Sequence, residues 1–143
     1  MPNRSRKEFK TYAKHLKQLN PEEGCEFCKF TPDTEQVLHE HRYFWVVKNI
    51  FPYSLWDELT VLDHLMLVPK QHTDSLDELP EEAAVEFVKL ISSYEAKGYG
   101  VFARAPQSKT KSIAHQHTHL IKNDHQHKKF LLYSRRPYLR ISL

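Results

Sequence analysis

Three histidines alternate with other residues in the segment Ser112–Ile121, which reads SIAHQHTHLI. Successive side chains of a strand point to opposite faces, so His115, His117 and His119 would share one face in a row about 13 Å long. Neighbouring imidazoles are poor core material because each ring has two nitrogens that need partners. The row therefore indicates either a solvated polar strand face or a site that uses imidazole chemistry.

Imidazoles in a row suit a phosphate site. A neutral imidazole is a good nucleophile at about pH 7, and a protonated neighbour can balance the charge of phosphoryl oxygens or donate to a leaving group. Histidines can also bind a metal, although rings at strand spacing rarely all converge on one ion. Phosphate chemistry is therefore the function that this segment favours.

Cys25 and Cys28 are the two cysteines of the chain and form the motif Cys-Glu-Phe-Cys. The sequence that precedes them has no apolar stretch behind its basic residues, so we expect no secretory signal and no disulfide scaffold. The motif then fits a zinc site, a redox pair or two buried thiols.

The composition is typical of one soluble domain. The 143 residues are 40% hydrophobic and 27% charged, near the globular average, and no apolar run approaches the ~18–20 residues that span a bilayer. The net charge of +3, from 21 basic and 18 acidic side chains, does not favour a nucleic-acid partner but would not repel a phosphorylated small molecule. We predict a cytoplasmic protein with no membrane partner.

Helices and strands that could hold these residues follow from periodicity and from proline and glycine. Apolar residues at helical spacing predict a short helix at about 4–19, and Asp77-Glu-Leu-Pro80 opens the clearest helix, which ends near Gly98. Aromatic and β-branched runs predict strands at 37–39, 42–48, 64–68, 99–104, 114–121, 129–133 and 138–142. One long helix among separated strands predicts an α+β fold with a mainly antiparallel sheet.

Four motifs together resemble the histidine-triad (HIT) superfamily of nucleotide hydrolases and transferases. They are the His-x-His-x-His segment with two apolar residues after it, Asp63–His72 (DHLMLVPKQH), Lys48–Tyr53 (KNIFPY) and Cys25–Phe30 (CEFCKF). Lys48–Tyr53 is similar to the dinucleoside-polyphosphate branch, and Cys25–Phe30 is similar to the zinc-bearing members. The motifs stand in family order, which makes their combination much more specific than any one of them.

A single HIT-like domain over residues 1–143 is what this resemblance implies. Its core would occupy about 22–121, preceded by the helix at about 4–19 and followed by C-terminal strands and a tail at 122–143.

Each matched residue acquires a role from the resemblance. His117 matches the middle histidine, which attacks the α-phosphorus to form a nucleotidyl-histidine while a main-chain carbonyl at the first triad histidine orients its ring. His119 would contact the phosphate, and His64 would line the same pocket. Ser112 would bond a phosphate oxygen or the leaving group, and Asn49 would bind ribose hydroxyls.

Zinc-bearing members hold one ion with two cysteines, the histidine after the Pro-Lys turn and the first triad histidine. These correspond to Cys25, Cys28, His72 and His115. Two thiolates and two imidazoles complete a tetrahedral site and leave no open position for substrate. The resemblance therefore implies a structural zinc and no catalytic cofactor.

Around the pocket, the chain departs from the family pattern. An insertion at 54–62 brings Trp56, which could cover a nucleotide base or fill a loop. Thr110-Lys111 replaces the usual Gly-Gln before the serine, so Lys111 is a candidate phosphate ligand, although a solvated lysine fits as well. Arg104 falls where many members carry Asn or Gln.

The leading hypothesis is a hydrolase that cleaves at the α-phosphate of dinucleoside polyphosphates or nucleoside phosphoramidates. One alternative is a nucleotide phosphorylase or nucleotidylyltransferase, in which another acceptor resolves the intermediate. Another is a zinc-stabilised module that binds nucleotides or nucleic-acid ends without turnover. Family members are usually homodimers, so the resemblance also implies a homodimer.

Overall fold

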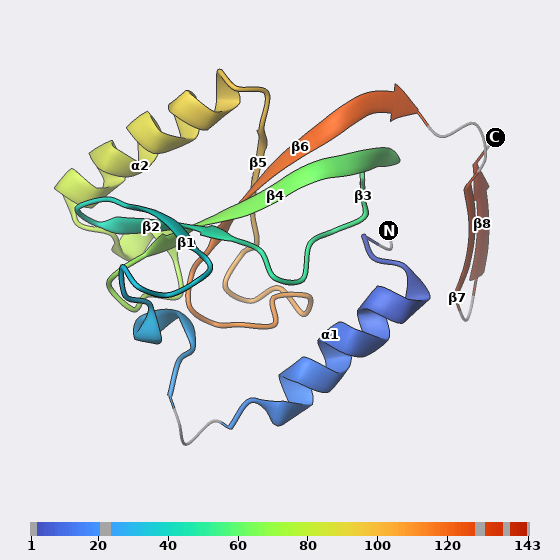
Figure 1. The fold of residues 1–143 in the computed structure, drawn as a ribbon, viewed down its shortest axis with the longest axis horizontal. Helices are drawn as coiled ribbons and strands as arrows, with labels where there is room; N and C mark the ends of the chain where they lie inside the picture. Colours follow the sequence, from blue (N-terminus) through green and yellow to red (C-terminus); the bar gives the residue numbers. More distant parts are fainter. Residues whose placement is uncertain (1–2, 21–23, 128–130, 136–137, 143) are drawn as a thin grey trace.

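The computed structural model describes residues 3–20, 24–127, 131–135 and 138–142. Two α-helices, α1 (Arg6–Gln18) and α2 (Glu81–Glu95), and two short 3-10 helices, η2 (Phe27–Lys29) and η3 (Leu76–Glu78), accompany eight strands (Figure 1). The strands are β1 (Val37–Glu40), β2 (Phe44–Lys48), β3 (Leu55–Trp56), β4 (Leu59–Pro69), β5 (Gly100–Ala103), β6 (Thr118–His127), β7 (Leu131–Arg135) and β8 (Tyr138–Ser142). None of the described helices is long and apolar enough to cross a membrane.

The central sheet has the strand order β1-β2-β4-β6-β5, and β3 pairs with β4 at one end. Strands β7 and β8 form a separate two-stranded sheet. Every pairing is antiparallel. The predicted α+β fold with a mainly antiparallel sheet is therefore confirmed, with β4 and β6 side by side at its centre.

Helix α2 covers one face of this sheet (Figure 1). Leu65 and Leu67 of β4 and Leu120 of β6 pack there with Ala83 and Leu90 of the helix. Strand side chains alternate between faces, so the residues that flank Leu65 on β4 must point to the opposite side of the sheet.

The opposite face carries a second apolar cluster, in which Trp45 of β2 and Met66 of β4 pack against Phe27 and Phe30. Ile113, from the segment that leads into β6, packs against the same cluster. The segment around η2 therefore covers the face of the sheet on which Met66 and the other even-numbered residues of β4 lie.

Helix α1 lies on this same side, along the loop that precedes β6 (Figure 1). It begins with a capping box, in which Ser5 and Glu8 bond to each other's backbone N–H groups. No residue of α1 is buried. The helix is instead held by surface contacts, among them the rings of Tyr12 and His15, whose centroids lie 5.4 and 4.7 Å from that of Phe51.

The strand predicted at 114–121 is the main correction, because β6 begins only at Thr118. His115 and His117 lie in the loop before it and do not form a strand row with His119. Gln116 donates its backbone N–H to the Thr73 carbonyl at 2.7 Å, which ties this segment to the turn after β4 and not to a neighbouring strand.

The insertion at 54–62 forms a hairpin of β3 and the start of β4, so β4 is longer than the predicted 64–68. Asp57 and Glu58 make its turn with φ angles of 51° and 65°, the left-handed pair that suits a tight hairpin. The strand predicted at 129–133 is observed as β7 from Leu131, and residues 129–130 lie outside the described residues.

Candidate functional site

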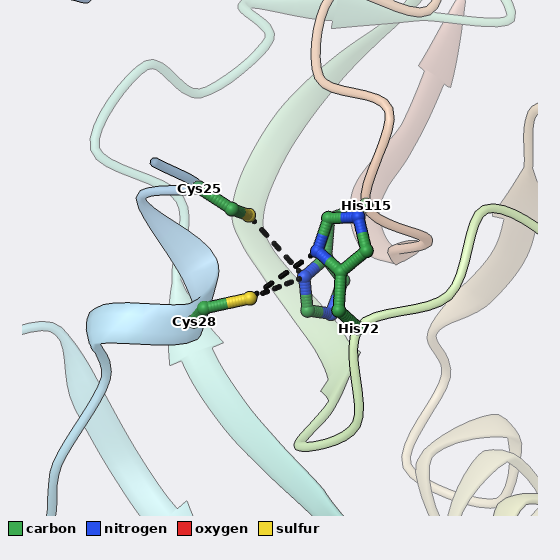
Figure 2. Close-up of side chains that lie close together, drawn as sticks. All are labelled: Cys25, Cys28, His72 and His115. Atoms are coloured by element: carbon green, nitrogen blue, oxygen red, sulfur yellow. Dashed lines mark hydrogen bonds between the residues drawn. The ribbon is translucent and has the colours of Figure 1, made fainter. Parts of the chain in front are cut away.

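Cys25, Cys28, His72 and His115 come together beside η2, as Figure 2 shows. Their donor atoms all lie within 4.8 Å of one another. The Cys28 sulfur lies 3.2 Å from Nδ1 of His72 and 3.5 Å from Nδ1 of His115, and the Cys25 sulfur lies 3.3 Å from the latter nitrogen. The structure thus brings together all four residues of the predicted metal site.

The dimensions of this cluster fit a tetrahedral zinc ion. Zinc binds sulfur at about 2.3 Å and nitrogen at about 2.0–2.1 Å, so a sulfur and a nitrogen at two corners of the tetrahedron would be about 3.6 Å apart. The observed sulfur–nitrogen distances of 3.2–3.5 Å are close to this value. Two thiols and two imidazoles are also a donor set that zinc prefers.

The position of the ring hydrogen of His115 also suits a bound metal ion. Nε2 of the fully buried His115 lies 2.9 Å from the Pro69 carbonyl oxygen, which can only accept, so Nε2 carries the hydrogen and Nδ1 keeps a lone pair. Burial, and then the neighbouring Cys25, raise the pKa of the Cys28 thiol. A divalent cation bound between the two sulfurs would favour their thiolate forms.

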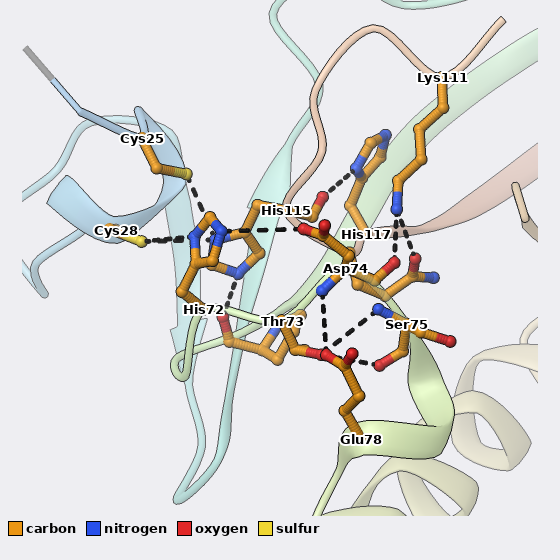
Figure 3. A network of polar contacts seen from close by, with 12 residues as sticks. Cys25, Cys28, His72, Thr73, Asp74, Ser75, Glu78, Lys111, His115 and His117 are labelled. Carbon is orange, nitrogen blue, oxygen red and sulfur yellow. Dashed lines mark hydrogen bonds and ion pairs between the residues drawn. The ribbon is translucent and has the colours of Figure 1, made fainter. Parts of the chain in front are cut away.

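His117 lies directly beyond this cluster and is 7% exposed. Its Nδ1 lies 2.9 Å from the main-chain oxygen of His115, so Nδ1 donates to that oxygen and Nε2 keeps a free lone pair (Figure 3). Burial lowers the pKa of His117. The ring is therefore neutral at physiological pH, with one nitrogen oriented by the backbone and the other available.

His64 and His119, both buried, form a second linked pair of imidazoles. Tyr53 donates its backbone N–H to Nδ1 of His64 at 3.0 Å, so the ring hydrogen of His64 sits on Nε2. That nitrogen lies 2.9 Å from Nδ1 of His119. Burial, followed by the nearby Arg4, lowers the pKa of His64 to about 3, and burial also lowers that of His119 well below its usual value.

The His64–His119 pair lies next to the ring of His117. The ring centroid of His119 lies 5.0 Å from that of His117. With Nδ1 accepting from His64, the neutral His119 ring carries its hydrogen on Nε2. These neighbouring rings thus offer a lone pair on His117 and a ring N–H on His119. The lone pair could attack a phosphoryl group, and the N–H could stabilise its negative charge.

Asn49 and Lys111, the predicted substrate ligands, are both engaged in bonds within the protein. Oδ1 of Asn49 accepts the Phe51 N–H at 2.9 Å, and the Nδ2 donor lies within 3.2 Å of Nε2 of His64, which carries that ring's hydrogen and donates to His119. The ammonium of Lys111 donates to the Asp74 carbonyl at 2.6 Å and to Oε1 of Gln116 at 3.1 Å (Figure 3). Asn49 therefore lies beside the histidines as expected, whereas Lys111 helps to hold the loop before β6.

Ser112, the predicted leaving-group contact, is exposed and lies beside helix α1. Its hydroxyl shares a hydrogen bond with the phenol of Tyr12. Nothing in the sequence pattern points to Tyr12, because the two residues are far apart in the chain and the helix was predicted only as an amphipathic element.

A cavity of about 570 Å³ opens between the C-terminal half of α1, the metal-ligand cluster and the loop before β6. Ser112 and His115 line this cavity, together with His15, Cys25 and His72, and His117 is not among its lining residues. The sequence predicts His117 in a phosphate pocket, whereas in the structure its ring is largely buried and does not line this cavity.

Solved structures identify the fold. No family model matches the sequence, and no curated protein matches it either. A HIT family hydrolase from Clostridium thermocellum has a TM-score of 0.54 and 22% identity, covering 75% of this chain and 97% of its own. A Zn-bound histidine triad family protein from Mycobacterium smegmatis has a TM-score of 0.53 and 18% identity, covering 72% and 77%.

A histidine triad nucleotide-binding protein from Candida albicans is similar at a TM-score of 0.52 and 21% identity, covering 71% of this chain and 76% of its own. The class defined by fold and site is an α+β domain with a Cys2His2 cluster beside a group of buried histidines. The chain has the fold of the histidine-triad superfamily.

Proposed function

We propose that this chain is a nucleotide hydrolase that cleaves at the α-phosphate of dinucleoside polyphosphates or nucleoside phosphoramidates, with His117 as the nucleophile. The observation that carries the proposal is the hydrogen bond from Nδ1 of His117 to the main-chain oxygen of His115. It fixes the tautomer that leaves Nε2 unprotonated, which a nucleophilic imidazole requires. The similar solved structures include a HIT family hydrolase and a histidine triad nucleotide-binding protein, which supports the same class.

The proposed reaction has two steps. Nε2 of His117 attacks the α-phosphorus, a phosphorus–nitrogen bond forms, and the bond to the leaving group breaks with its electron pair on that group. Water then attacks the same phosphorus, loses a proton to solvent, and releases the nucleoside monophosphate as the phosphorus–nitrogen bond breaks. The N–H of His119 is placed to stabilise negative charge on the phosphoryl oxygens in both steps.

We assign the Cys25, Cys28, His72 and His115 cluster to one structural zinc ion. Bound there, zinc would fix the N-terminal segment to the loop before β6 and complete a closed tetrahedral site. The four protein ligands fill the coordination shell, so the ion would act through the position of His115 and not through contact with substrate.

The test is turnover of diadenosine polyphosphates and adenosine phosphoramidate by the purified protein. His117→Ala should lose activity on any substrate that the wild type cleaves, whereas His39→Ala should keep it, because His39 is an exposed residue of β1. Full activity in His117→Ala, or no turnover of either substrate by the wild type, would refute the proposal.

A hydrolase differs from a phosphorylase or nucleotidylyltransferase in the molecule that accepts the nucleotidyl group from His117. Reactions run with excess inorganic phosphate would give a nucleoside diphosphate from a phosphorylase and a nucleoside monophosphate from a hydrolase. We expect the monophosphate, because His119 stands where some transferases carry Gln.

A non-catalytic nucleotide-binding module is a second candidate, favoured by the burial of the proposed nucleophile. Ser112 is bonded to Tyr12, and the ring of His117 is 7% exposed. Saturable binding of a nucleotide without turnover would support this candidate in place of the hydrolase.

The homodimer and the cytoplasmic location remain predictions. Light scattering would test the homodimer.

A further inference from the structure

Two arginines from distant parts of the sequence converge on one tyrosine ring. The guanidinium carbon of Arg4 lies 4.6 Å from the ring centroid of Tyr53. Arg104 donates to the phenol oxygen of the same Tyr53 at 3.2 Å. Both arginines are half-buried, and each lies close enough to the other for Arg104 to help lower the pKa of Arg4, although burial is the main cause.

Neither arginine has an ion-pair partner among the residues that the structure describes. Arg4 donates to the main-chain oxygen of Phe51 at 2.6 and 3.2 Å, and Arg104 donates to the Thr110 hydroxyl at 2.6 Å. The nearby carboxylate of Glu8 accepts instead from Ser5 and Ser54. A guanidinium stays charged under physiological conditions, so the two positive charges are only partly compensated, by the Glu8 carboxylate that lies close enough to attract Arg4.

This cationic pair borders the histidine pocket. The ring centroid of Tyr53 lies 4.5 Å from that of His64 and 5.4 Å from that of His119. On its other side, the guanidinium of Arg4 lies 4.3 Å from the ring centroid of Tyr12, the residue bonded to Ser112. Tyr53 therefore connects Arg4 to His119, the proposed phosphate contact. Tyr12 connects it to Ser112, the proposed leaving-group contact.

Lys111 and the two arginines are the positive charges that act on the histidines, and the ammonium of Lys111 is already bonded to Asp74 and Gln116. With His64 and His119 held neutral by burial, the histidines supply hydrogen-bond donors and lone pairs but no positive charge. A single phosphate at His117 could be stabilised by ring N–H groups alone. A pair of only partly compensated guanidiniums beside it is suited to further anionic oxygens, which arginine binds in a planar, bidentate manner.

We propose that Arg4 and Arg104 form a second anion subsite, which binds the phosphate chain next to the attacked α-phosphate. The inference rests on the proposed function of the same pocket and narrows its substrate class to nucleotides whose leaving group is itself a phosphate chain. When the bridging α-phosphorus–oxygen bond breaks, its electron pair stays on the departing phosphate, and the two guanidiniums neutralise that added charge. A phosphoramidate, whose leaving group is an amine, gains nothing from this subsite.

The test compares two substrates that share one AMP group, diadenosine tetraphosphate and adenosine phosphoramidate. Arg4→Gln and Arg104→Gln should each lower kcat/KM for the tetraphosphate about 10–100-fold and leave kcat/KM for the phosphoramidate within about twofold. Arg42→Gln is the matched control, because the exposed Arg42 also stacks on a tyrosine, Tyr43, but at the far side of the sheet from α1. Equal losses on both substrates, or no loss on the tetraphosphate, would overturn the subsite.

Binding of inorganic tripolyphosphate, measured by calorimetry, separates this inference from the proposed function. The wild type should bind it, His117→Ala should retain binding, and Arg4→Gln should weaken it about tenfold or more, with Arg4→Lys intermediate because the charge remains. If the wild type binds tripolyphosphate but turns over no substrate, the hydrolase fails and the subsite stands. If it does not bind, or if Arg4→Gln binds as well as the wild type, the subsite is wrong even where the phosphoramidate is cleaved.

Discussion

The main-chain oxygen of His115 accepts the hydrogen bond that orients His117, while the ring of His115 lies between the two cysteine sulfurs. One residue therefore belongs to both halves of the site. Its backbone sets the tautomer of the proposed nucleophile, and its side chain completes the metal-ligand cluster. Because one residue serves both halves of the site, the geometry of His117 should depend on the integrity of the metal cluster.

The first prediction concerns Cys28→Ser. This change removes one of four donors and leaves a hydroxyl that binds zinc poorly, so the zinc content should fall from about one per chain to well below that. The melting temperature should fall by roughly 5–10 °C, since each kcal/mol lost shifts Tm by about 3–5 °C in a domain of this size. Elemental analysis and calorimetry measure the two effects.

Glu35→Gln is the control for this prediction, because Glu35 is exposed on the loop that follows η2 and should change neither quantity. Turnover should fall in Cys28→Ser together with its zinc content, as the support for the His115 carbonyl is lost. A fully zinc-loaded Cys28→Ser variant with wild-type Tm would show that this cluster is not the metal site.

Much of the fold follows from local patterns in the sequence. Alternation along β4 puts Leu65 and Leu67 towards α2, and β-branched and aromatic residues mark most of the strands. The segment before β6 breaks this rule. Its alternating histidines resemble a strand, yet the ring of His115 turns to the cysteines and the backbone of Gln116 bonds to the turn at Thr73, so strand pairing begins later.

The metal cluster could be predicted because its four residues stand in recognisable motifs, and the structure brings them together. Arg4 and Tyr12 could not be predicted as site residues, because only the tertiary packing of α1 brings them near Tyr53 and Ser112. The sequence around a charged residue that precedes an amphipathic helix does not indicate which other residues that helix will contact in the fold.

The second prediction is a loss of stability in acid that depends on His64. Its pKa is lowered to about 3 in the folded protein, from about 6.5 in the unfolded chain. Below about pH 6.5 the unfolded chain binds a proton at this site that the folded protein does not, so stability falls as the pH falls from 6.5 towards 3. The expected slope for this one buried group is about 1.4 kcal/mol per pH unit.

Comparison with His64→Phe isolates this contribution. The free energy of unfolding, measured with urea at several values between pH 4 and about 7, should depend less steeply on pH in the variant, by about the slope of one group. The difference between the two profiles reports His64 together with His119, whose ring is bonded to it. Parallel pH profiles would show that His64 is not held neutral by the fold.

The third prediction uses two leucines of the same strand. Leu67 of β4 is 1% exposed and packs under α2, whereas Leu62 is 64% exposed. Leu67→Ala should lower the free energy of unfolding by about 2–5 kcal/mol, because it leaves a cavity in the core. Leu62→Ala should change it by less than about 0.5 kcal/mol. Similar losses in the two variants, measured by urea unfolding, would contradict the packing of β4 against α2.

The fourth prediction concerns Trp56 of the inserted hairpin. Its ring stacks on that of Tyr53, with centroids 5.6 Å apart and planes at 8°. Tyr53 in turn contacts His64 and His119. A nucleotide bound at these histidines would disturb this stack, because Tyr53 contacts both the histidines and Trp56. Binding of AMP should therefore change the tryptophan fluorescence.

Trp45 provides the matched control, since it is the second tryptophan of the chain and packs in the cluster with Phe27 and Phe30. Trp45→Phe should keep the fluorescence response to AMP, and Trp56→Phe should lose it while still binding AMP by calorimetry. A response that survives in Trp56→Phe and vanishes in Trp45→Phe would place the nucleotide away from the hairpin. Because the measurement needs no turnover, it locates the nucleotide for the hydrolase and for the binding module alike.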